Sequence, residues 1–186
     1  MNKKTLTAAT VLIWCLSPCA AGKAQSSPSR TRVEPTAAIR ATAYQMMKAF
    51  LTQDVATFKR HAAPRTLKLV SLVYEGARQD PRYQPEMQKA RITNADQFLG
   101  YFMLGLATQY LQGVPLPPEA AARRVANDST ISFVNDSEAN ITIAGSVFAR
   151  ARRVARDWKI DLADSLKKSV LKEITDPDLR ARIKSL

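Results

Sequence analysis

The sequence is poor in cysteine and histidine, which removes several kinds of chemistry. Its 186 residues include two cysteines, Cys15 and Cys19, and a single histidine, His61. Because both cysteines lie within the first 19 residues, the rest of the chain offers neither a disulfide nor a thiolate nucleophile. The carboxylates are scattered and no second histidine accompanies the first, so no metal-ligand spacing is present. We therefore predict no catalytic residue, no metal site and no cofactor.

The single histidine is surrounded by positive charge. His61 lies close in sequence to Lys59, Arg60 and Arg65. Neighbouring cations disfavour a further positive charge, so we expect the pKa of His61 to be lowered and its imidazole to be neutral. A lone histidine is more often a surface or capping residue than a catalyst.

Acidic residues are scarce relative to basic ones. The chain has 28 Lys and Arg residues against 16 Asp and Glu residues, a formal net charge of +12. Such a charge favours encounter with anionic partners such as phospholipid head groups or cell-wall polymers. The alternative is a basic surface that serves solubility and has no dedicated partner. We expect no nucleic acid partner, because the N-terminus predicts export.

The N-terminus has the order of zones found in export signals. Two lysines precede an apolar stretch over residues 5–16, and small residues follow up to Ala24. The apolar stretch is shorter than the roughly 20 residues that span a bilayer as a helix. We predict a signal peptide over residues 1–24, a flexible leader over residues 25–35, and an exported protein that is periplasmic or secreted.

Cys19 leaves an alternative open. The run Leu16-Ser17-Pro18-Cys19 loosely resembles the lipobox of bacterial lipoproteins, although the proline before the cysteine departs from it. A lipid anchor at Cys19 is therefore the alternative to an unanchored chain.

Apolar residues recur at three- and four-residue spacing over much of the first two thirds of the chain, which predicts helices. The predicted helices begin at Thr36 and Asp54, continue in a stripe from Leu67 that ends at Gly76, resume over residues 95–111 after a loop at residues 78–85, and add one or two turns over residues 119–125. The helix over residues 95–111 is the most apolar and is expected to be buried on most sides.

The hydrophobic period then changes to two, which predicts strands. Short β-branched or aromatic runs occupy residues 130–134, 139–143, 146–155 and 158–162, with turn residues between them. Two further helices are expected after the strands, over residues 165–174 and 176–186. Helices ahead of an antiparallel meander predict an α+β fold, with N-terminal helices packed on a curved antiparallel sheet of about four strands and additional C-terminal helices.

Two segments resemble the nuclear transport factor two superfamily, in which a curved antiparallel sheet wraps around N-terminal helices as a cone. They are Ala43–Leu51 (AYQMMKAFL) with the following Thr52-Gln53-Asp54, and the closing run Arg156–Leu162 (RDWKIDL). The resemblance implies a single domain over residues 36–186, with a cone core over about 36–162 and a C-terminal helical extension over 163–186. Members of the superfamily include enzymes, small-molecule binders and assembly modules, so the fold does not select a function.

The resemblance also implies where a ligand pocket would lie. Enzymes of this superfamily place a histidine or an aspartate inside the cone. In this chain we expect apolar and aromatic residues there instead, and the candidate pocket residues are Tyr44, Met47, Phe98, Phe102 and Trp158. The alternative is that the same side chains form a filled core.

Asp161 is the one acidic residue of the last predicted strand that could point into the sheet. It alternates with Trp158, Ile160 and Leu162, so we expect it on the solvent side. An acid/base site inside the cone is therefore not predicted.

The most distinctive local feature is a run of cations on the last two predicted strands. Arg150, Arg152 and Arg156 share strand parity, and Lys159 joins them if the register permits. We predict an anion-binding face for a phosphate or carboxylate polymer, and the alternative is a solvated sheet surface that discourages edge pairing.

Together these features predict an exported, non-catalytic binding or scaffold module of the cell envelope. Its partner would be an anionic envelope component or another envelope protein. The alternative is a small-molecule carrier or an enzyme that uses an apolar pocket inside the cone. The sequence leaves the oligomeric state open, and a dimer is compatible with it.

Overall fold

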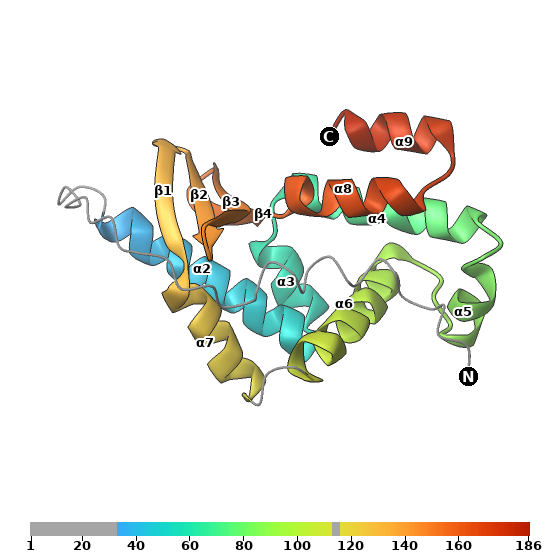
Figure 1. The fold of residues 1–186 in the computed structure, drawn as a ribbon, viewed down its shortest axis with the longest axis horizontal. Coiled ribbons are helices and arrows are strands. Elements are labelled where there is room, and N and C mark those ends of the chain that lie inside the picture. The colour runs from blue at the N-terminus through green and yellow to red at the C-terminus, as the bar shows by residue number, and fades with distance from the viewer. Residues whose placement is uncertain (1–32, 113–115) are drawn as a thin grey trace.

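The computed structural model describes residues 33–112 and 116–186, as six helices, four strands and two more helices (Figure 1). The first six helices are α2 (Val33–Thr52), α3 (Val55–His61), α4 (Pro64–Gln79), α5 (Gln84–Lys89), α6 (Ala95–Gln112) and α7 (Pro118–Asp128). The strands are β1 (Thr130–Asn135), β2 (Glu138–Ile143), β3 (Ser146–Val154) and β4 (Asp157–Asp161), and the last helices are α8 (Ala163–Glu173) and α9 (Pro177–Lys184). The predicted signal peptide, most of the predicted leader, and both cysteines lie outside the described residues.

The four strands form the predicted meander, an antiparallel sheet in the order β1-β2-β3-β4. Ile131 lies opposite Ile141, and Ala139 lies opposite Ala151. The register between β2 and β3 shifts at Phe148, an extra residue that is buried together with its neighbour Ala149. Such a bulge increases the local bend of a strand, and the sheet is curved and open (Figure 1).

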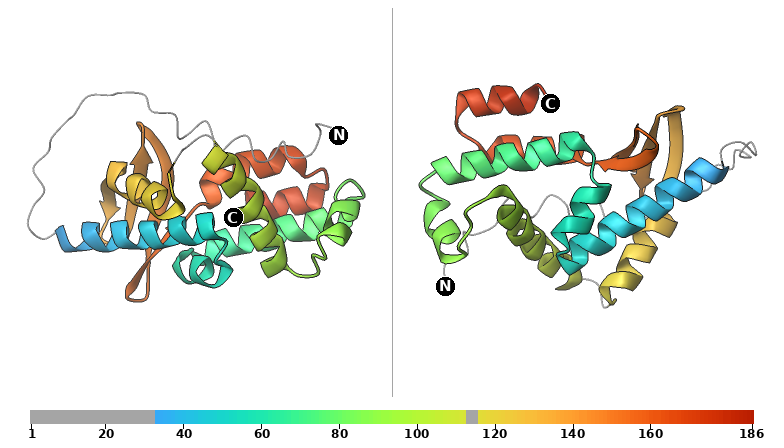
Figure 2. Two further views of the ribbon diagram at one scale, coloured as in Figure 1. Left: turned by 90° about the horizontal axis from the view of Figure 1, so that it is seen from below. Right: turned by 180° about the vertical axis from the view of Figure 1, so that it is seen from behind.

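One face of this sheet is covered by α2, the long first helix (Figures 1 and 2). Helices α3, α6 and α7 pack around α2, and α3 also contacts β4. The main core lies between these layers and contains Ile39, Met46, Leu99, Met103, Ala139, Ile141, Ala151, Trp158 and Ile160. Helices laid on one face of an antiparallel sheet confirm the predicted α+β class.

Helix starts follow their capping residues. The side chain of Asp54 accepts a hydrogen bond from the backbone N–H of Thr57 at 3.0 Å and opens α3. The side chain of Asp176 accepts a hydrogen bond from the backbone N–H of Leu179 at 2.7 Å at the start of α9. Pro177 lies in the first turn of this helix, where proline is common. Pro64 likewise lies in the first turn of a helix, because it begins α4 and does not interrupt one.

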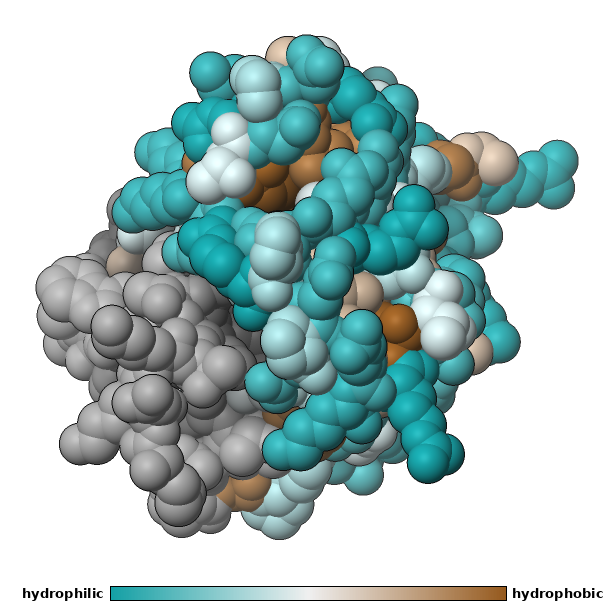
Figure 3. Space-filling view, turned by 90° about the vertical axis from the view of Figure 1, so that its right-hand side faces the viewer, coloured by the Kyte–Doolittle hydropathy of each residue, from teal (hydrophilic) through white to brown (hydrophobic). Residues whose placement is uncertain are grey.

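The C-terminal helices pack on α4, and the three lie side by side in both figures of the fold (Figures 1 and 2). Their shared cluster contains Leu69, Leu72, Ala163, Ile174, Leu179 and Ile183. On this side of the molecule apolar surface gathers in a small area that hydrophilic residues enclose (Figure 3). The helical extension therefore has a core of its own, which α4 shares.

Several helix boundaries differ from the prediction. Gly76 does not end α4, which continues to Gln79. A Cβ at Gly76 would lie 2.6 Å from Leu179 Cδ2, so this glycine permits the close approach of α9. The segment over residues 78–85, which is predicted as a loop, is partly helical. Helix α7 has eleven residues, where the prediction gives one or two turns. Helix α2 begins at Val33, three residues before the predicted start at Thr36.

Trp158 lies in the main core, as the filled-core alternative to a pocket position requires. Its side chain is buried between the sheet and α2, and its ring packs edge-on against Phe133 with centroids 6.1 Å apart. We expect Trp158→Ala to lower the free energy of unfolding by about 3–5 kcal/mol, because it leaves a cavity in the main core. Urea denaturation followed by circular dichroism measures this loss.

Val154 provides the matched control, since it lies on the neighbouring strand and is exposed. Val154→Ala should change the free energy of unfolding by no more than about 0.5 kcal/mol. A loss below about 1 kcal/mol for Trp158→Ala would contradict a structural role for the indole.

Candidate functional site on the open face of the sheet

The sheet face that points away from α2, which we call the open face, is mostly polar. Strand residues alternate between the two faces, so the core positions of β2 and β3 leave every second side chain on the open face. The polar members of this face are Thr130, Ser132, Glu138, Asn140, Thr142, Arg150, Arg152, Asp157, Lys159 and Asp161.

Valines interrupt this polar surface. Val147 lies opposite Thr142 and Val154 lies opposite Asp157, so both belong to the open face. Val134 is exposed beside the turn between β1 and β2. Of the four large apolar side chains that the described residues expose, three are these valines and the fourth is Leu104 of α6.

Six charged side chains form a cluster where the open face meets α4 and α8. Ion pairs connect them into one network, the Asp161 cluster, which contains Arg65, Glu138, Arg150, Arg152, Asp161 and Asp164. Three guanidinium groups thus face three carboxylates, and the cluster has no net charge.

Asp161 is the buried centre of this cluster, with a side chain that is 1% exposed. Its Oδ1 accepts hydrogen bonds from Thr66 Oγ1 at 3.2 Å and from the backbone N–H of Ala163 at 2.9 Å. Its Oδ2 lies 3.2 Å from Arg65 Nη1 and 3.1 Å from Arg152 Nε. The contact with Arg152 Nε is an ion pair without hydrogen-bond alignment. Both carboxylate oxygens are therefore compensated, as a buried charge requires.

The solvent-facing position predicted for Asp161 is wrong. The residue does alternate away from Trp158 and Ile160, but α4 and α8 cover this end of the open face. Arg65 and Thr66, which reach Asp161 from α4, are more than 90 residues away in the sequence. Strand periodicity alone cannot reveal such a cover.

Arg150 and Arg152, from the predicted anion-binding face, are members of the Asp161 cluster. Arg150 Nη1 lies 3.0 Å from Glu138 Oε1, and Arg150 Nε lies 3.8 Å from Asp164. Arg152 Nη2 lies 3.5 Å from the same Glu138 oxygen. Their charges are compensated within the protein, so this part of the face is neither a bare cationic strip nor simply solvated.

The other two predicted cations differ from this pair. Lys159 lies opposite Arg152 as the predicted register requires, and its Nζ donates to the carbonyl oxygen of Arg60 at 2.5 Å. Arg156 lies in the turn between β3 and β4, is exposed, and makes no ion pair within residues 33–112 and 116–186. The structure thus brings three of the four cations to one face and leaves Arg156 at its end.

Sequence reasoning missed the carboxylates that neutralise these arginines. Glu138 lies directly opposite Arg152, and Asp161 lies directly opposite Arg150. Both pairings follow once the short turns fix the register of the meander. Searching the predicted hairpins for positions where a carboxylate lies opposite an arginine would have identified both pairs.

Three groups at or near this face have shifted pKa values. A hydrogen bond from the Arg65 guanidinium holds the pKa of Asp164 below its usual value, and the same bond raises the pKa of Arg65. The pKa of His61 is lowered, chiefly by burial and then by the charges of Lys159 and Arg60. The direction predicted for His61 is confirmed, although burial contributes more than the basic neighbours do.

The five residues predicted to line an apolar pocket do not converge. Trp158 belongs to the main core, and Met47 packs between that core and a second cluster beside α7. Phe98 and Phe102 stack on one another at 6.4 Å, on the side of α6 where Phe98 also meets Tyr74 at 5.8 Å. Their packing favours the filled-core interpretation of these side chains.

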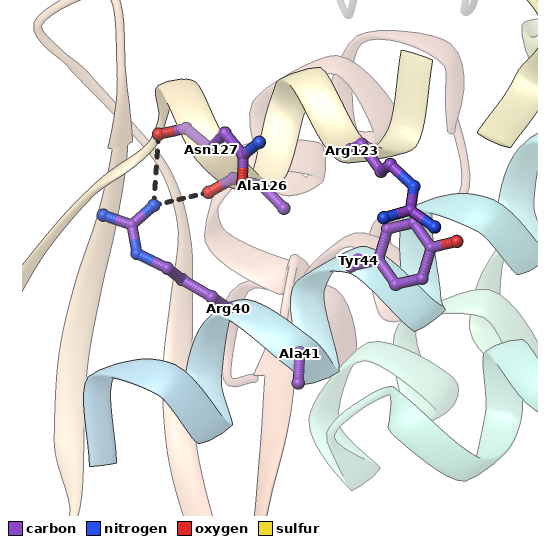
Figure 4. Close-up of a pocket in the computed structure, with 6 residues that line it drawn as sticks. All are labelled: Arg40, Ala41, Tyr44, Arg123, Ala126 and Asn127. Carbon is purple, nitrogen blue, oxygen red and sulfur yellow. Dashed lines mark hydrogen bonds between the residues drawn. The ribbon is translucent and has the colours of Figure 1, made fainter. Parts of the chain in front are cut away.

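Tyr44, the fifth of these residues, borders a shallow hollow between α2 and α7 (Figure 4). Arg40 spans one side, and its Nη1 donates to the carbonyl oxygens of Ala126 at 2.6 Å and Asn127 at 3.1 Å near the end of α7. Arg123 lies over the Tyr44 ring, 5.4 Å from its centroid, and donates to Glu119 at 3.0 Å. These polar groups already join α2 to α7, so the hollow is a structural contact.

Other site classes receive no support in the described part of the chain. There, no three histidine, cysteine or carboxylate side chains gather as metal ligands. None of the described helices combines the length and apolar character needed to cross a membrane. In comparisons with known proteins, no family model, no curated protein and no solved structure matches the chain.

The burial of Asp161 leads to a stability prediction. Asp161→Asn preserves the shape of the side chain but leaves Arg65 and Arg152 without their shared anion. Breaking a buried ion pair lowers the free energy of unfolding by about 3–5 kcal/mol. Because both arginines are partly exposed and can be hydrated, we expect a decrease of about 3 kcal/mol, at the lower end of this range. Chemical denaturation measures this difference.

Asp157→Asn is the matched control on the same strand, because the side chain of Asp157 is 78% exposed. It should change the free energy of unfolding by less than about 0.5 kcal/mol. An equal decrease in the free energy of unfolding for both variants would show that the buried Asp161 does not stabilise the cluster more than an exposed carboxylate does.

The lowered pKa of Asp164 predicts that the stability of the fold depends on pH. A carboxyl whose pKa is lower in the folded state stabilises the fold above its unfolded pKa, near 3.8, and loses this contribution as the pH falls through the folded value. Asp164→Asn should therefore lower the free energy of unfolding at neutral pH by less than about 1 kcal/mol, since the side chain is 45% exposed. Melting temperatures of both proteins between about pH 7 and about pH 3 should converge at the acid end, whereas a constant difference would contradict the ionic role.

Proposed function

We propose that this protein is an exported, non-catalytic binding or scaffold module that docks another envelope protein through the open face of its sheet. The observation that carries the proposal is the exposure of Val147 and Val154, at 54% and 38%, on a face that α4 and α8 cover only in part. Burying an exposed valine contributes about 1.5 kcal/mol. The two valines lie near opposite ends of β3, so they offer a protein partner two separate apolar contacts with hydrogen-bonding and charged groups between them.

The charge distribution favours a protein partner over an anionic polymer. Binding of a polyanion depends on cations that are free to replace counterions. Arg150 and Arg152 are already compensated by Glu138, Asp161 and Asp164. A partner with hydrogen-bonding groups and apolar side chains can pair with Thr130, Ser132, Asn140 and Thr142 without displacing these ions.

Export and superfamily membership are parts of the same proposal. Export rests on the order of zones in residues 1–24, which lie outside the described residues. Membership of the nuclear transport factor two superfamily is supported by a long first helix laid across a curved antiparallel meander. Neither assignment depends on which partner the open face binds.

Site-specific photo-crosslinking in the cells that produce the protein tests the docking surface. A benzophenone side chain is placed at Val147, at Val154 and, as a control, at Arg124 on the exposed side of α7. We expect the two positions on the open face to yield the same adduct with one partner and the control to yield none, because α7 lies on the other side of α2 from the sheet.

A second variant separates docking from chance proximity. Val147→Asp places a charge at one of the two apolar contacts of the open face and should weaken the adduct formed from position 154, near the other end of β3. Val147→Ile keeps this contact apolar and should preserve the adduct. Equal adduct yields from all three crosslinker positions, or none from the open face, would refute docking at this surface.

A further inference from the structure

We infer that protonation of His61 loosens the contact by which the end of α3 covers the edge of β4, so that mild acid exposes this edge of the sheet. The inference goes beyond docking at the open face, because it concerns backbone groups at the rim of the sheet and a change of state. His61 is the only histidine of the chain and the last residue of α3. Histidine is the side chain whose charge ordinarily changes near neutral pH.

The first step is the cover itself, which we call the α3–β4 contact. Ala62 lies beside Ile160 in a parallel bridge, and the backbone N–H of Ala63 donates to the carbonyl oxygen of Ile160 at 2.8 Å. From the strand, Lys159 Nζ donates to the carbonyl oxygen of Arg60 at 2.5 Å. Because β4 is a terminal strand of the sheet, these bonds occupy an edge to which another strand could otherwise add.

The second step is the charge around the imidazole. His61 is half-buried, and its cationic neighbours are Lys159 of β4 and Arg60 of α3. Burial, then Lys159, then Arg60 lower the pKa of His61, and Asp157 of β4 acts in the opposite direction. The side chain of Asp157 is 78% exposed and lies 3.9 Å from Lys159 Nζ, so water and the lysine both weaken its attraction for a proton on the imidazole. A proton on His61 therefore adds a third positive charge to the α3–β4 contact.

The third step is the end of the helix, which offsets little of this repulsion. A protonated histidine near a helix C-terminus is ordinarily stabilised by the free carbonyl groups there. In α3 the carbonyl oxygen of Arg60 already accepts from Lys159 Nζ, and that of Phe58 accepts from the backbone N–H of Ala62. With these acceptors occupied, the helix end favours a further cation less.

The fourth step is the sign of the pH dependence. A histidine whose pKa is lower in the closed contact binds its proton more readily when the contact is open. The closed contact therefore has its full stability above the ordinary pKa of 6.5 and loses it as the pH falls through the lower value of the closed state. In the open state the imidazole is hydrated and further from Lys159, so mild acid favours that state.

Amide hydrogen exchange of the full, untagged chain tests the inference at the backbone N–H of Ala63. The protection factor compares the observed rate with the intrinsic rate at the same pH, so the direct effect of pH on exchange cancels. We expect this factor to fall several-fold between about pH 7.5 and about pH 5, below a ceiling of about 30-fold that a pKa of 6.5 in the open state sets. His61→Gln keeps a polar side chain that does not titrate, and it should abolish the fall.

The backbone N–H of Ile92 is the matched control. It donates to the carbonyl oxygen of Met87 at 2.8 Å just after α5, far from β4 (Figure 1). Its protection factor should stay the same over this pH range. A constant protection factor at Ala63, or an equal fall at Ala63 and Ile92, would overturn the inference, because the proton would then act on neither or on the whole fold.

Titration of the His61 imidazole by NMR tests the electrostatic part separately. Because the chain has one histidine, its ring signals are identified without further assignment. We expect a midpoint below 6.5 in the wild type, a higher midpoint in Arg60→Gln, and the wild-type midpoint in Arg60→Lys. The side chain of Arg60 is exposed, and its carbonyl oxygen still accepts from Lys159 in both variants. A wild-type midpoint at or above 6.5, or one that Arg60→Gln does not raise, would overturn the inference.

Discussion

The carboxylate of Asp161 is the group on which the arrangement of the sheet and the C-terminal helices depends. A buried charge is tolerated only when its oxygens are paired and hydrogen-bonded, and this one has four compensating contacts. Those contacts come from α4, from β3 and from the first residue of α8. Satisfying one side chain therefore fixes the path of the chain where it leaves β4, and it brings the first turn of α8 to the end of the sheet, from which the helix continues alongside α4 (Figure 1).

The same requirement explains why a strand with three arginines does not present a cationic surface. Arg150 and Arg152 stand beside Glu138 and Asp161 across the strands, and Asp164 completes the balance from α8. In water each of these pairs would contribute little. At the covered end of the face they share partners in one network, so removing one member leaves others uncompensated. The net positive charge of the chain accordingly resides on other surfaces, among them the turn that holds Arg156.

Periodicity and turn chemistry predicted the parts of this fold that are set by nearby residues. The meander, the caps at Asp54 and Asp176, and the burial of Trp158 follow from local patterns. Gly76 and Asp161 were misjudged because their surroundings are supplied by distant segments, α9 in one case and α4 with α8 in the other. The pattern of apolar residues in α2 and α6 predicted burial correctly for Met46 and Met103, but it could not reveal whether the interior is filled or hollow. The difference between a core and a cavity depends on how several helices meet, and a single helix does not contain this information.

These constraints also determine which surfaces remain for binding. The helix α2 covers one face of the sheet, the helices that satisfy Asp161 cover the β4 end of the other face, and residues 62–63 cover the β4 edge. The part of the open face beyond these covers stays exposed, and its valines Val147 and Val154 lie on β3, next to β4. Because these two valines lie near opposite ends of β3, a partner that contacts both has to follow the strand across Arg150 and Arg152, whose charges are already compensated.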